Sequence, residues 1–255
     1  MTRALREHTL RQAQVRVYSD RDAACAAAAE RFRELAREAA AAGRRFAVAL
    51  TGGSAPGPLH ARLGAEPLRS TIPWEAVHLF WGDERCVPPA HARSNFGAAW
   101  RAGLAGVPLP PENVHRIRGE LPPREAAARY ADELRACFGD EVPAFDLVYL
   151  GVGEDAHVAS LFPFSPLLLE RERAVATALR LPESEWRVTL TLPALNAARR
   201  VEFLAFGEAK RAVVHRVLLG ALDPLRLPAQ AVRPASGELL WRLDVNAECG
   251  SRNAE

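Results

Sequence analysis

The densest set of reactive side chains lies in the stretch LGVGEDAHVASLFP, residues 150–163. The stretch follows an apolar run and, after two glycines, presents Glu154, Asp155 and His157 before apolar residues return. An imidazole can accept a proton near neutral pH, and a neighbouring carboxylate can fix its tautomer. The stretch therefore predicts either a catalytic loop at the carboxyl end of a strand or a polar loop between two core elements.

Within this stretch, a water activated by histidine is a better prediction than a serine nucleophile. Ser160 is expected one turn into a helix that follows the loop, which is a poor position for a nucleophile. No Ser-His-Asp triad is completed nearby by sequence order. His157 is therefore expected to act as the base for a water, and the alternative is a histidine that only caps the following helix.

A second candidate is the glycine-rich stretch TGGSAPG, which follows the apolar run at residues 46–50. Gly52 and Gly53 allow backbone N–H groups to approach an anion, and Ser54 adds a hydroxyl. The helix expected after them would point its positive end at the same place. The stretch lacks G-x-x-x-x-G-K-[ST] and G-x-G-x-x-G, so it does not indicate nucleotide binding. It predicts a phosphate cradle, with a tight strand-to-helix turn as the alternative.

Two further polar stretches also follow apolar runs. In GEAK, Lys210 is the only lysine among 33 basic residues, and it occupies the first turn of a predicted helix, where the dipole disfavours a cation. A bound anion would offset that cost, so Lys210 is predicted to bind phosphate, with a solvated surface lysine as the alternative. In GDER, Arg85 could hold an oxyanion and Asp83 could orient a water or a substrate hydroxyl; the alternative is a structural salt bridge.

The elements that must position these residues are short apolar strands that alternate with helices. Strands are predicted at 46–50, 76–81, 145–150, 201–206 and 238–243, and helices at 20–42, 57–63 and 208–219. The alternation predicts an α/β fold, a doubly wound and mostly parallel sheet with helices on both faces. Because parallel strands end at one edge of the sheet, TGGS, GDER, GVGEDAH and GEAK are expected to face one crevice.

The composition is that of an ordinary soluble protein, with 255 residues, 49% of them hydrophobic and 25% charged, and a net charge of +2. It argues against a nucleic-acid partner, and no apolar run reaches the roughly 20 residues of a membrane span. The N-terminal stretch lacks the apolar segment of a signal peptide, so a cytoplasmic location is expected. A monomer is favoured, with a homodimer as the alternative. Residues 1–13 and 247–255 are expected to be exposed tails.

The four cysteines, Cys25, Cys86, Cys137 and Cys249, are far apart in the sequence, without a C-x-x-C pair or a metal-like spacing. They predict neither a structural zinc site nor a disulfide framework, and free thiols are the expectation. No metal ion is therefore expected in the functional site.

Taken together, these stretches resemble the 6-phosphogluconolactonases of the glucosamine-6-phosphate isomerase/6-phosphogluconolactonase family. The resemblance rests on TGGSAP, WGDERCVP with the later Ser94-Asn95, LGVGEDAHVASLFP and RVTLTLPALNAARRVEFLAFGEAK, in this order along nearly the whole chain. It implies a Rossmann-like fold shared with glucosamine-6-phosphate deaminase and ribose-5-phosphate isomerase, and one sugar-phosphate-binding domain over residues 1–255. It also implies hydrolysis of 6-phospho-D-glucono-1,5-lactone to 6-phosphogluconate without a cofactor.

The resemblance further implies a role for each matching residue. His157 would be the general base, with Asp155 beside it and with Asp83 and Arg85 as the catalytic residues at the sugar end. Phosphate and substrate binding would fall to Gly52, Gly53, Ser54, Asn95, Arg187 and Lys210. Arg85 or backbone N–H groups would stabilise the charge that grows on the carbonyl oxygen.

One position departs from the family pattern, and two other functions stay open. The family writes G-x-D-G-H where this chain has Ala156 in place of the second glycine. If this position has a positive φ, alanine costs roughly 1 kcal/mol or more, and if φ is negative, alanine is harmless. The first alternative function is a glucosamine-6-phosphate deaminase, although residues 159–163 lack the carboxylate that the deaminases have there. The second is a sugar-phosphate sensor that binds without turnover.

Overall fold

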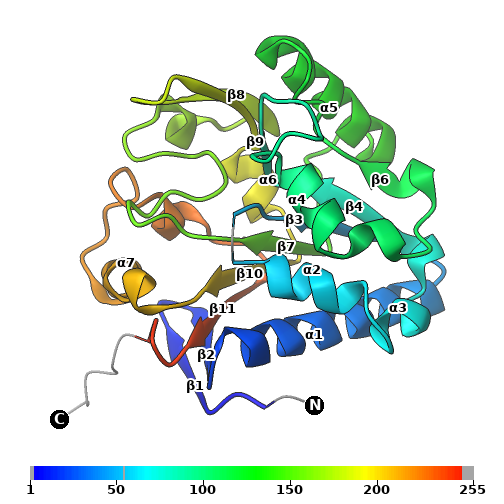
Figure 1. Ribbon diagram of the computed structural model, residues 1–255. Helices are drawn as coiled ribbons and strands as arrows, with labels where there is room; N and C mark the ends of the chain where they lie inside the picture. Colours follow the sequence, from blue (N-terminus) through cyan, green and yellow to red (C-terminus); the bar gives the residue numbers. More distant parts are fainter. Residues whose placement is uncertain (1–2, 54, 249–255) are drawn as a thin grey trace.

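The fold is built on a large central sheet (Figure 1). The computed structural model describes residues 3–53 and 55–248. Within these ranges the sheet has eight strands in the order β1-β2-β11-β10-β7-β3-β4-β6. They are β1 (Arg6–Leu10), β2 (Ala13–Tyr18), β3 (Phe46–Leu50), β4 (Val77–Trp81), β6 (Val114–His115), β7 (Leu147–Leu150), β10 (Arg200–Ala205) and β11 (Glu238–Asp244). Neighbouring strands are parallel except β1 and β2, which confirms the predicted mostly parallel sheet.

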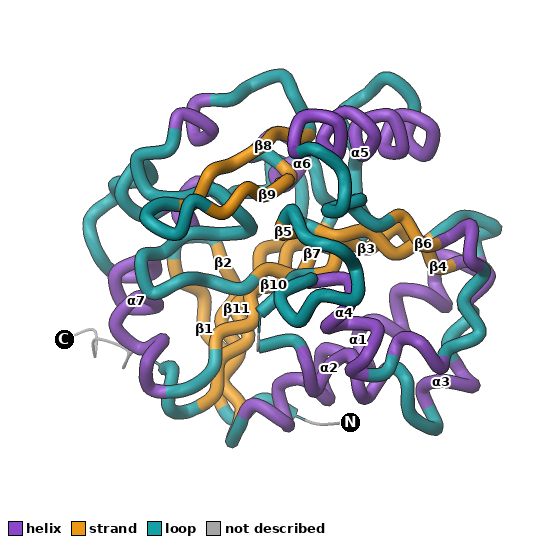
Figure 2. The backbone as a smooth tube through the Cα atoms, turned by 45° about the horizontal axis from the view of Figure 1, so that its top comes forward, coloured by secondary structure: helices purple, strands orange, loops and turns teal. Residues whose placement is uncertain are grey.

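The inner strands form where the sequence has continuous apolar runs. Every residue of β3 and of β7 is buried, as expected for strands that are covered on both faces. Figure 2 shows β3, β7 and β10 side by side in the middle of the sheet. Strand order runs from β3 to β4 in one direction and from β7 to β10 in the other, so β3 and β7 flank the point where it reverses. Open α/β sheets bind their ligands at such a switch point.

Helices cover both faces of the central sheet, as predicted. They are α1 (Arg21–Ala41), α2 (Gly57–Leu63), α3 (Leu68–Thr71), α4 (Asn95–Ala102), α5 (Pro123–Phe138), α6 (Leu192–Asn196) and α7 (Glu208–Leu219), with short 3-10 turns η1 (Trp74–Ala76), η2 (Leu104–Gly106), η3 (Pro111–Asn113), η4 (Pro166–Leu169) and η5 (Pro228–Ala231). In Figure 1, α1, α2 and α3 lie below the sheet and α5 and α6 lie above it. Asp20 caps α1 by accepting the Ala23 N–H at 2.8 Å, and Gly43 follows its end with a φ of 64°.

A second, antiparallel sheet was not predicted from the sequence. It contains β5 (Asp83–Arg85), β8 (Val175–Arg180) and β9 (Glu185–Leu190) in the order β5-β9-β8. The interpretation of GDER as a loop is therefore wrong, because Asp83 pairs with Thr189 and Arg85 pairs with Arg187. The three polar residues of β5 show no alternating strand pattern. They form a strand only because β9, which is distant in the sequence, pairs with them.

The segment after β7 contains no helix, contrary to the expectation for Ser160. Val158 and Leu161 form an isolated antiparallel bridge, and Ser160 lies between them, fully buried. The Ser160 N–H donates to Thr189 Oγ1 at 3.1 Å, so a contact with β9 takes the place of a helical turn. The expected tail at residues 1–13 is also wrong in part, since β1 forms there.

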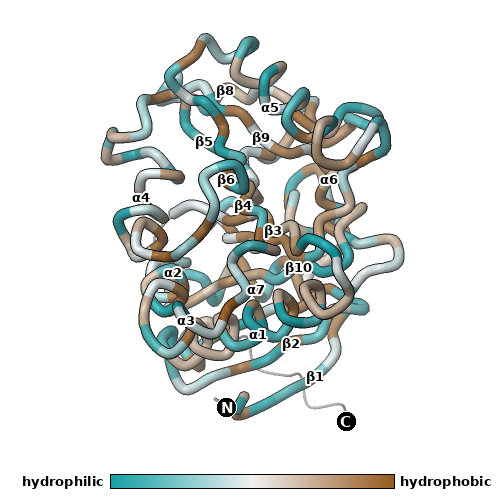
Figure 3. Tube along the Cα trace, turned by 90° about the vertical axis from the view of Figure 1, so that its right-hand side faces the viewer, coloured by the Kyte–Doolittle hydropathy of each residue, from teal (hydrophilic) through white to brown (hydrophobic). Residues whose placement is uncertain are grey.

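The buried side chains of both sheets belong to one hydrophobic cluster, which includes Phe46 of β3, Trp241 of β11 and Val188 of β9. Figure 3 shows the hydrophobic segments around β3 and β10 in the interior and the hydrophilic β1 at the edge. No helix in the described ranges is both long enough and apolar enough to cross a membrane. The single domain over residues 1–255 stays a prediction.

Candidate active site

Four segments meet at the switch point between β3 and β7. A cavity of about 410 Å³ lies there, and the segments that follow β3, β4, β7 and β10 all line it. Its lining includes Thr51, Gly52, Gly53, Asp83, Arg85, Asn95, Gly153, His157, Arg187, Gly207 and Lys210. Thr51 Oγ1 accepts the Gly151 N–H at 3.1 Å, which ties the two central loops to each other. The structure thus brings the four polar stretches together, as the strand order requires.

The carboxylate of Asp155 holds the imidazole of His157. His157 Nδ1 lies 2.6 Å from Asp155 Oδ1, and the same oxygen accepts the His157 backbone N–H at 3.1 Å. Burial opposes the charge of Asp155, but the hydrogen bonds and charge of His157 outweigh it and lower the pKa of Asp155 to about 2. The carboxylate is therefore ionised and accepts the Nδ1 proton, which leaves the Nε2 lone pair of the neutral ring to accept a proton.

The loop that carries this pair depends on two positions. The Gly153 N–H donates to the His157 carbonyl at 2.9 Å, and a Cβ on Gly153 would overlap with the His157 ring and the Asp155 carboxylate. Ala156 is fully buried with a φ of 69°, and its carbonyl accepts the Ala229 N–H at 3.0 Å. The position therefore has a positive φ, where alanine costs roughly 1 kcal/mol relative to glycine.

Asp83 joins the histidine loop to the rest of the cavity. Ser160 Oγ donates to Asp83 Oδ2 at 2.7 Å, and Asn95 Nδ2 donates to Asp83 Oδ1 at 2.9 Å. Arg187 Nη1 lies 3.8 Å from Asp83 Oδ2. Both carboxylate oxygens therefore have protein partners, and the residue is only 5% exposed. These contacts favour a positioning role for Asp83 over the predicted contact with a reacting water.

Arg85 and Asn95 form a second link between loops. Arg85 Nη1 donates to Asn95 Oδ1 at 2.8 Å and to the Arg93 carbonyl at 2.7 Å. A Cβ on Gly52 would overlap with the side chain of Asn95, so the loop after β3 lies directly against it. Gly52 is therefore required for close packing, in addition to the approach of a backbone N–H to an anion that the sequence indicated.

Glu84 is a supporting residue to which sequence reasoning assigned no role. Its carboxylate accepts the backbone N–H groups of Asn95 at 2.7 Å and of Phe96 at 2.8 Å, and the Ser94 hydroxyl at 2.9 Å. Burial raises the pKa of Glu84, and these donors act in the opposite direction. The carboxylate fixes the N-terminus of α4 and, with it, Asn95. Its partners lie on another element, so no local pattern signals the contact.

Cationic side chains line the cavity as well; below, the part formed by Gly52, Gly53, Gly207 and Lys210 is called the anion end and the part formed by Asp155 and His157 the histidine end. Lys210 lies in the first turn of α7, as predicted. Arg21, at the start of α1, also lines the cavity, although its sequence context is that of an ordinary helix residue. Asp244, at the end of β11, accepts the Gly207 N–H at 3.0 and 3.1 Å and so fixes the entry to α7. Ser54, predicted to contact phosphate, lies outside the described residues.

The charges around the cavity suit an anionic ligand. Arg21, Arg85, Arg187 and Lys210 line it, against the carboxylates of Asp83 and Asp244, and Arg187 is also paired with Glu185 Oε2 at 2.6 Å. The N-terminus of α7 adds a partial positive charge at the same end. A phosphate monoester placed here would meet an excess of positive charge.

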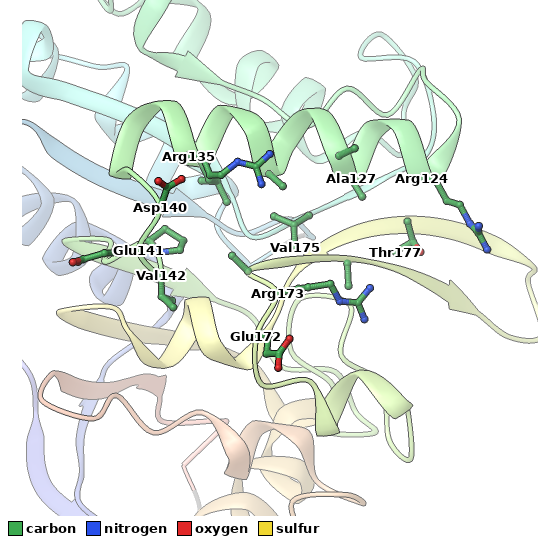
Figure 4. Close-up of a pocket in the computed structure, with 16 residues that line it drawn as sticks. Arg124, Ala127, Arg135, Asp140, Glu141, Val142, Glu172, Arg173, Val175 and Thr177 are labelled. Carbon is green, nitrogen blue, oxygen red and sulfur yellow. The ribbon is translucent and has the colours of Figure 1, made fainter.

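A larger cavity lies elsewhere, between α5 and β8. Its volume is about 820 Å³, and Figure 4 shows Arg124 and Arg135 on the helix, with Val175 and Thr177 on the strand below. Its lining residues include no histidine, serine or cysteine, and none of the predicted site residues. The cavity at the switch point is therefore the better candidate for chemistry.

Comparison with known proteins identifies the family of this chain. Residues 19–241 match the family described as glucosamine-6-phosphate isomerases/6-phosphogluconolactonase. A 6-phosphogluconolactonase of Homo sapiens is 46% identical over 214 residues, 82% of this chain and 81% of that protein, and one of a Nostoc species is 41% identical over 207 residues, 80% and 83%. The structure of the 6-phosphogluconolactonase from Trypanosoma cruzi has a TM-score of 0.82 at 26% identity, covering 94% of this chain and 97% of that one. The chain therefore belongs to the glucosamine-6-phosphate isomerase/6-phosphogluconolactonase family.

Proposed function

We propose that this chain hydrolyses 6-phospho-D-glucono-1,5-lactone to 6-phosphogluconate. Relatives named 6-phosphogluconolactonase, at 34% to 46% identity over most of the chain, support this activity. The observation that carries the assignment of the cavity is the hydrogen-bonded pair of His157 and Asp155 beside an excess of cationic side chains. A base at one end and an anion site at the other fit a phosphorylated lactone.

The proposed base is Nε2 of His157. Asp155 holds the Nδ1 proton, so Nε2 can take a proton from a water while the water oxygen bonds to the lactone carbonyl carbon. The π electrons move to the carbonyl oxygen, and Arg85 or backbone N–H groups of the glycine loops stabilise that oxyanion. When the carbonyl re-forms, the bond from its carbon to the ring oxygen breaks, and the imidazolium returns its proton to the ring oxygen.

The proposed anchor is the phosphate group at the far end of the substrate. Lys210, the N-terminus of α7 and the backbone of Gly52 and Gly53 would hold it. Binding energy gained there can position the lactone carbonyl against the water, although the phosphate takes no part in bond making. Arg187 and Asn95 are proposed to contact the sugar, and both lie in the same cavity.

We also propose one domain over residues 1–255, a cytoplasmic location and a monomer, with a homodimer as the alternative. The location follows from the proposed substrate, because phosphorylated sugars carry charges that disfavour crossing of a bilayer. Light scattering during size-exclusion chromatography tests the monomer, and a mass of twice 27.8 kDa would favour the homodimer.

The two alternative functions receive less support. Residues 159–163, Ala-Ser-Leu-Phe-Pro, contain no carboxylate for the ring opening of an amino sugar, which argues against a deaminase. A sensor without turnover would follow if Ala156 displaced the base. Its positive φ, however, coexists with an intact hydrogen bond between His157 and Asp155.

The test is acid release from freshly made lactone, with the spontaneous rate subtracted. Wild type should exceed the background clearly, and His157→Ala should lower kcat/KM at least about a hundredfold. His215→Ala is a matched control, because His215 is exposed on α7 and does not line the cavity, and its rate should equal that of wild type. A wild type that only matches the background would overturn the activity, and a fully active His157→Ala would overturn the base.

A further inference from the structure

A second cluster of reactive side chains lies at the edge of the central sheet, away from the candidate active site. It comprises His78 of β4, His115 of β6, and Glu133 and Cys137 of α5. The ligand atoms of His115, Glu133 and Cys137 all lie within 4.8 Å of one another. None of the four residues lines the cavity at the switch point, so the proposed hydrolysis leaves this cluster without a role.

The donor set has the chemistry of a transition-metal site. His115 Nδ1 lies 2.7 Å from Glu133 Oε1 and 3.8 Å from Cys137 Sγ. Glu133 and Cys137 are four residues apart on α5, so one helix face presents both. Imidazole, thiolate and carboxylate are the ligands that Zn²⁺ uses in proteins. The Glu133 side chain is 45% exposed, which gives an ion and a fourth, water ligand access from solvent.

The surroundings hold the central imidazole in the orientation that a metal ligand needs. His115 Nε2 lies 2.9 Å from His78 Nδ1, and the Phe80 ring stacks on His115 with centroids 4.3 Å apart. His78 Nδ1 is therefore placed to accept an N–H from His115 Nε2. A metal-bound imidazole usually donates its other N–H to such a partner, which fixes its tautomer.

We propose that His115, Glu133 and Cys137 bind one divalent transition-metal ion, with zinc as the best match, and that His78 orients His115. The negative charges of the thiolate and the carboxylate balance the two positive charges of the ion. Arg45 lies next to the cluster, and its guanidinium donates to the Cys137 carbonyl. The bound ion stabilises the packing of α5 against β6, because its three ligands come from these two elements.

Binding redistributes the protons of the cluster in a defined way. The ion takes the place of the hydrogen between His115 Nδ1 and Glu133. The proton of His115 then sits on Nε2 and is donated to His78 Nδ1, while His78 carries its own proton on its other ring nitrogen. When Cys137 binds the ion as a thiolate, the thiol releases its proton to solvent.

The experiment is a titration of the metal-free full chain with Co²⁺, a spectroscopic probe for zinc sites. We expect one equivalent to produce a thiolate-to-cobalt charge-transfer band in the near ultraviolet, and Zn²⁺ to remove it stoichiometrically. Cys137→Ser should lose this band and bind Co²⁺ at least about tenfold more weakly. Cys86→Ser is the matched control, because Cys86 is also a partly buried thiol and lies outside the cluster, and it should keep the band.

Thermal unfolding gives a second readout. Zn²⁺ should raise the Tm of wild type and of Cys86→Ser, and should raise the Tm of Cys137→Ser by clearly less at the same Zn²⁺ concentration. If Cys137→Ser does not fold, Glu133→Gln replaces it, since that side chain is half exposed and its loss should weaken Co²⁺ binding without unfolding the chain. The proposal is overturned if wild type shows no thiolate band at one equivalent, or if the replacement of Cys137 or Glu133 leaves binding unchanged.

Discussion

The two ends of the candidate cavity are built by different means. At the histidine end, side chains hold one another, since Asp155 fixes His157 and Asp83 binds Ser160. At the anion end, glycine backbone and the start of α7 line the cavity together with Lys210, whose ammonium makes no ion pair or hydrogen bond with the residues that the structure describes. The end proposed for bond making is thus fixed in geometry, and the anion end relies on charge, which tolerates small displacements.

This difference predicts how substitutions at each end should act on kinetics. Loss of an attraction that substrate and transition state share raises KM and leaves kcat nearly unchanged. Displacement of a group that acts only during bond making lowers kcat instead. Variants at the two ends should therefore separate into these two classes.

The largest effect in this comparison is expected from Lys210→Ala. A hydrogen bond between charged groups contributes about 1.5–3 kcal/mol, so KM should rise about 10- to 100-fold while kcat changes little. Arg211→Ala is the matched control, because Arg211 is an exposed neighbour on α7 that does not line the cavity. A fall in kcat at constant KM would contradict the charge-based account of the anion end.

A smaller effect on the kinetics is expected from Gly153→Ala at the histidine end. The added Cβ would overlap with the His157 ring, so kcat should fall about tenfold or more, and the free energy of unfolding should decrease by about 1–3 kcal/mol. Gly151→Ala tests the same loop without an overlap, since the nearest atom to its Cβ would be Thr51 Oγ1 at 3.8 Å. Equal kinetics for the two variants would show that the loop is not rigid.

Local patterns were sufficient for the elements that frame the cavity. The apolar runs at β3, β7 and β10 were all predicted from neighbouring residues. Because parallel strands end at one edge, the strand pattern also placed the polar loops in one crevice. The order of the strands then decided which loops became neighbours.

Contacts between distant segments were not predictable in the same way. The strand β5 exists only because β9 pairs with it, and Ser160 is held by Thr189 of β9 rather than by a helical turn. Arg21, Glu84 and Asp244 reach the site or its supports from elements whose local sequence carries no signal. Tertiary contacts override local preference at these places.

A modest change in stability is expected at Ala156. Ala156→Gly would remove the strain of alanine at a positive φ, which costs roughly 1–2 kcal/mol. Two effects oppose this gain in stability: glycine increases the chain entropy of the unfolded state, and one buried methyl group is lost. The free energy of unfolding should rise by no more than about 1 kcal/mol, with activity retained.

Ala156→Val is the contrasting variant. A β-branched side chain adds to the strain at a positive φ and overfills a fully buried site, so Tm should fall markedly below that of wild type. Equal stability of the glycine and valine variants would mean that the loop adopts another conformation in solution.

The smallest effect is the dependence of stability on acid at the histidine end. The pKa of Asp155 is about 2, below its usual value of 3.8, so its carboxylate stabilises the fold fully above pH 4 and loses this contribution as the pH falls to about 2. The difference in unfolding free energy between wild type and Asp155→Asn should therefore shrink across this window. Since the side chain is 46% exposed, the difference at pH 7 should stay below about 1 kcal/mol.

Asp132→Asn, on an exposed part of α5, corrects this comparison for the loss of a surface carboxylate. If the difference in unfolding free energy between wild type and Asp155→Asn stayed constant from pH 7 to pH 2, the Asp155 carboxylate would not be stabilised by His157 in the folded state. The histidine end would then lack the hydrogen bond that sets its tautomer, and its geometry would be no more fixed than that of the anion end. If this difference in unfolding free energy decreased only below pH 4, the loop would be stabilised by the same hydrogen bond that sets the tautomer of the proposed base.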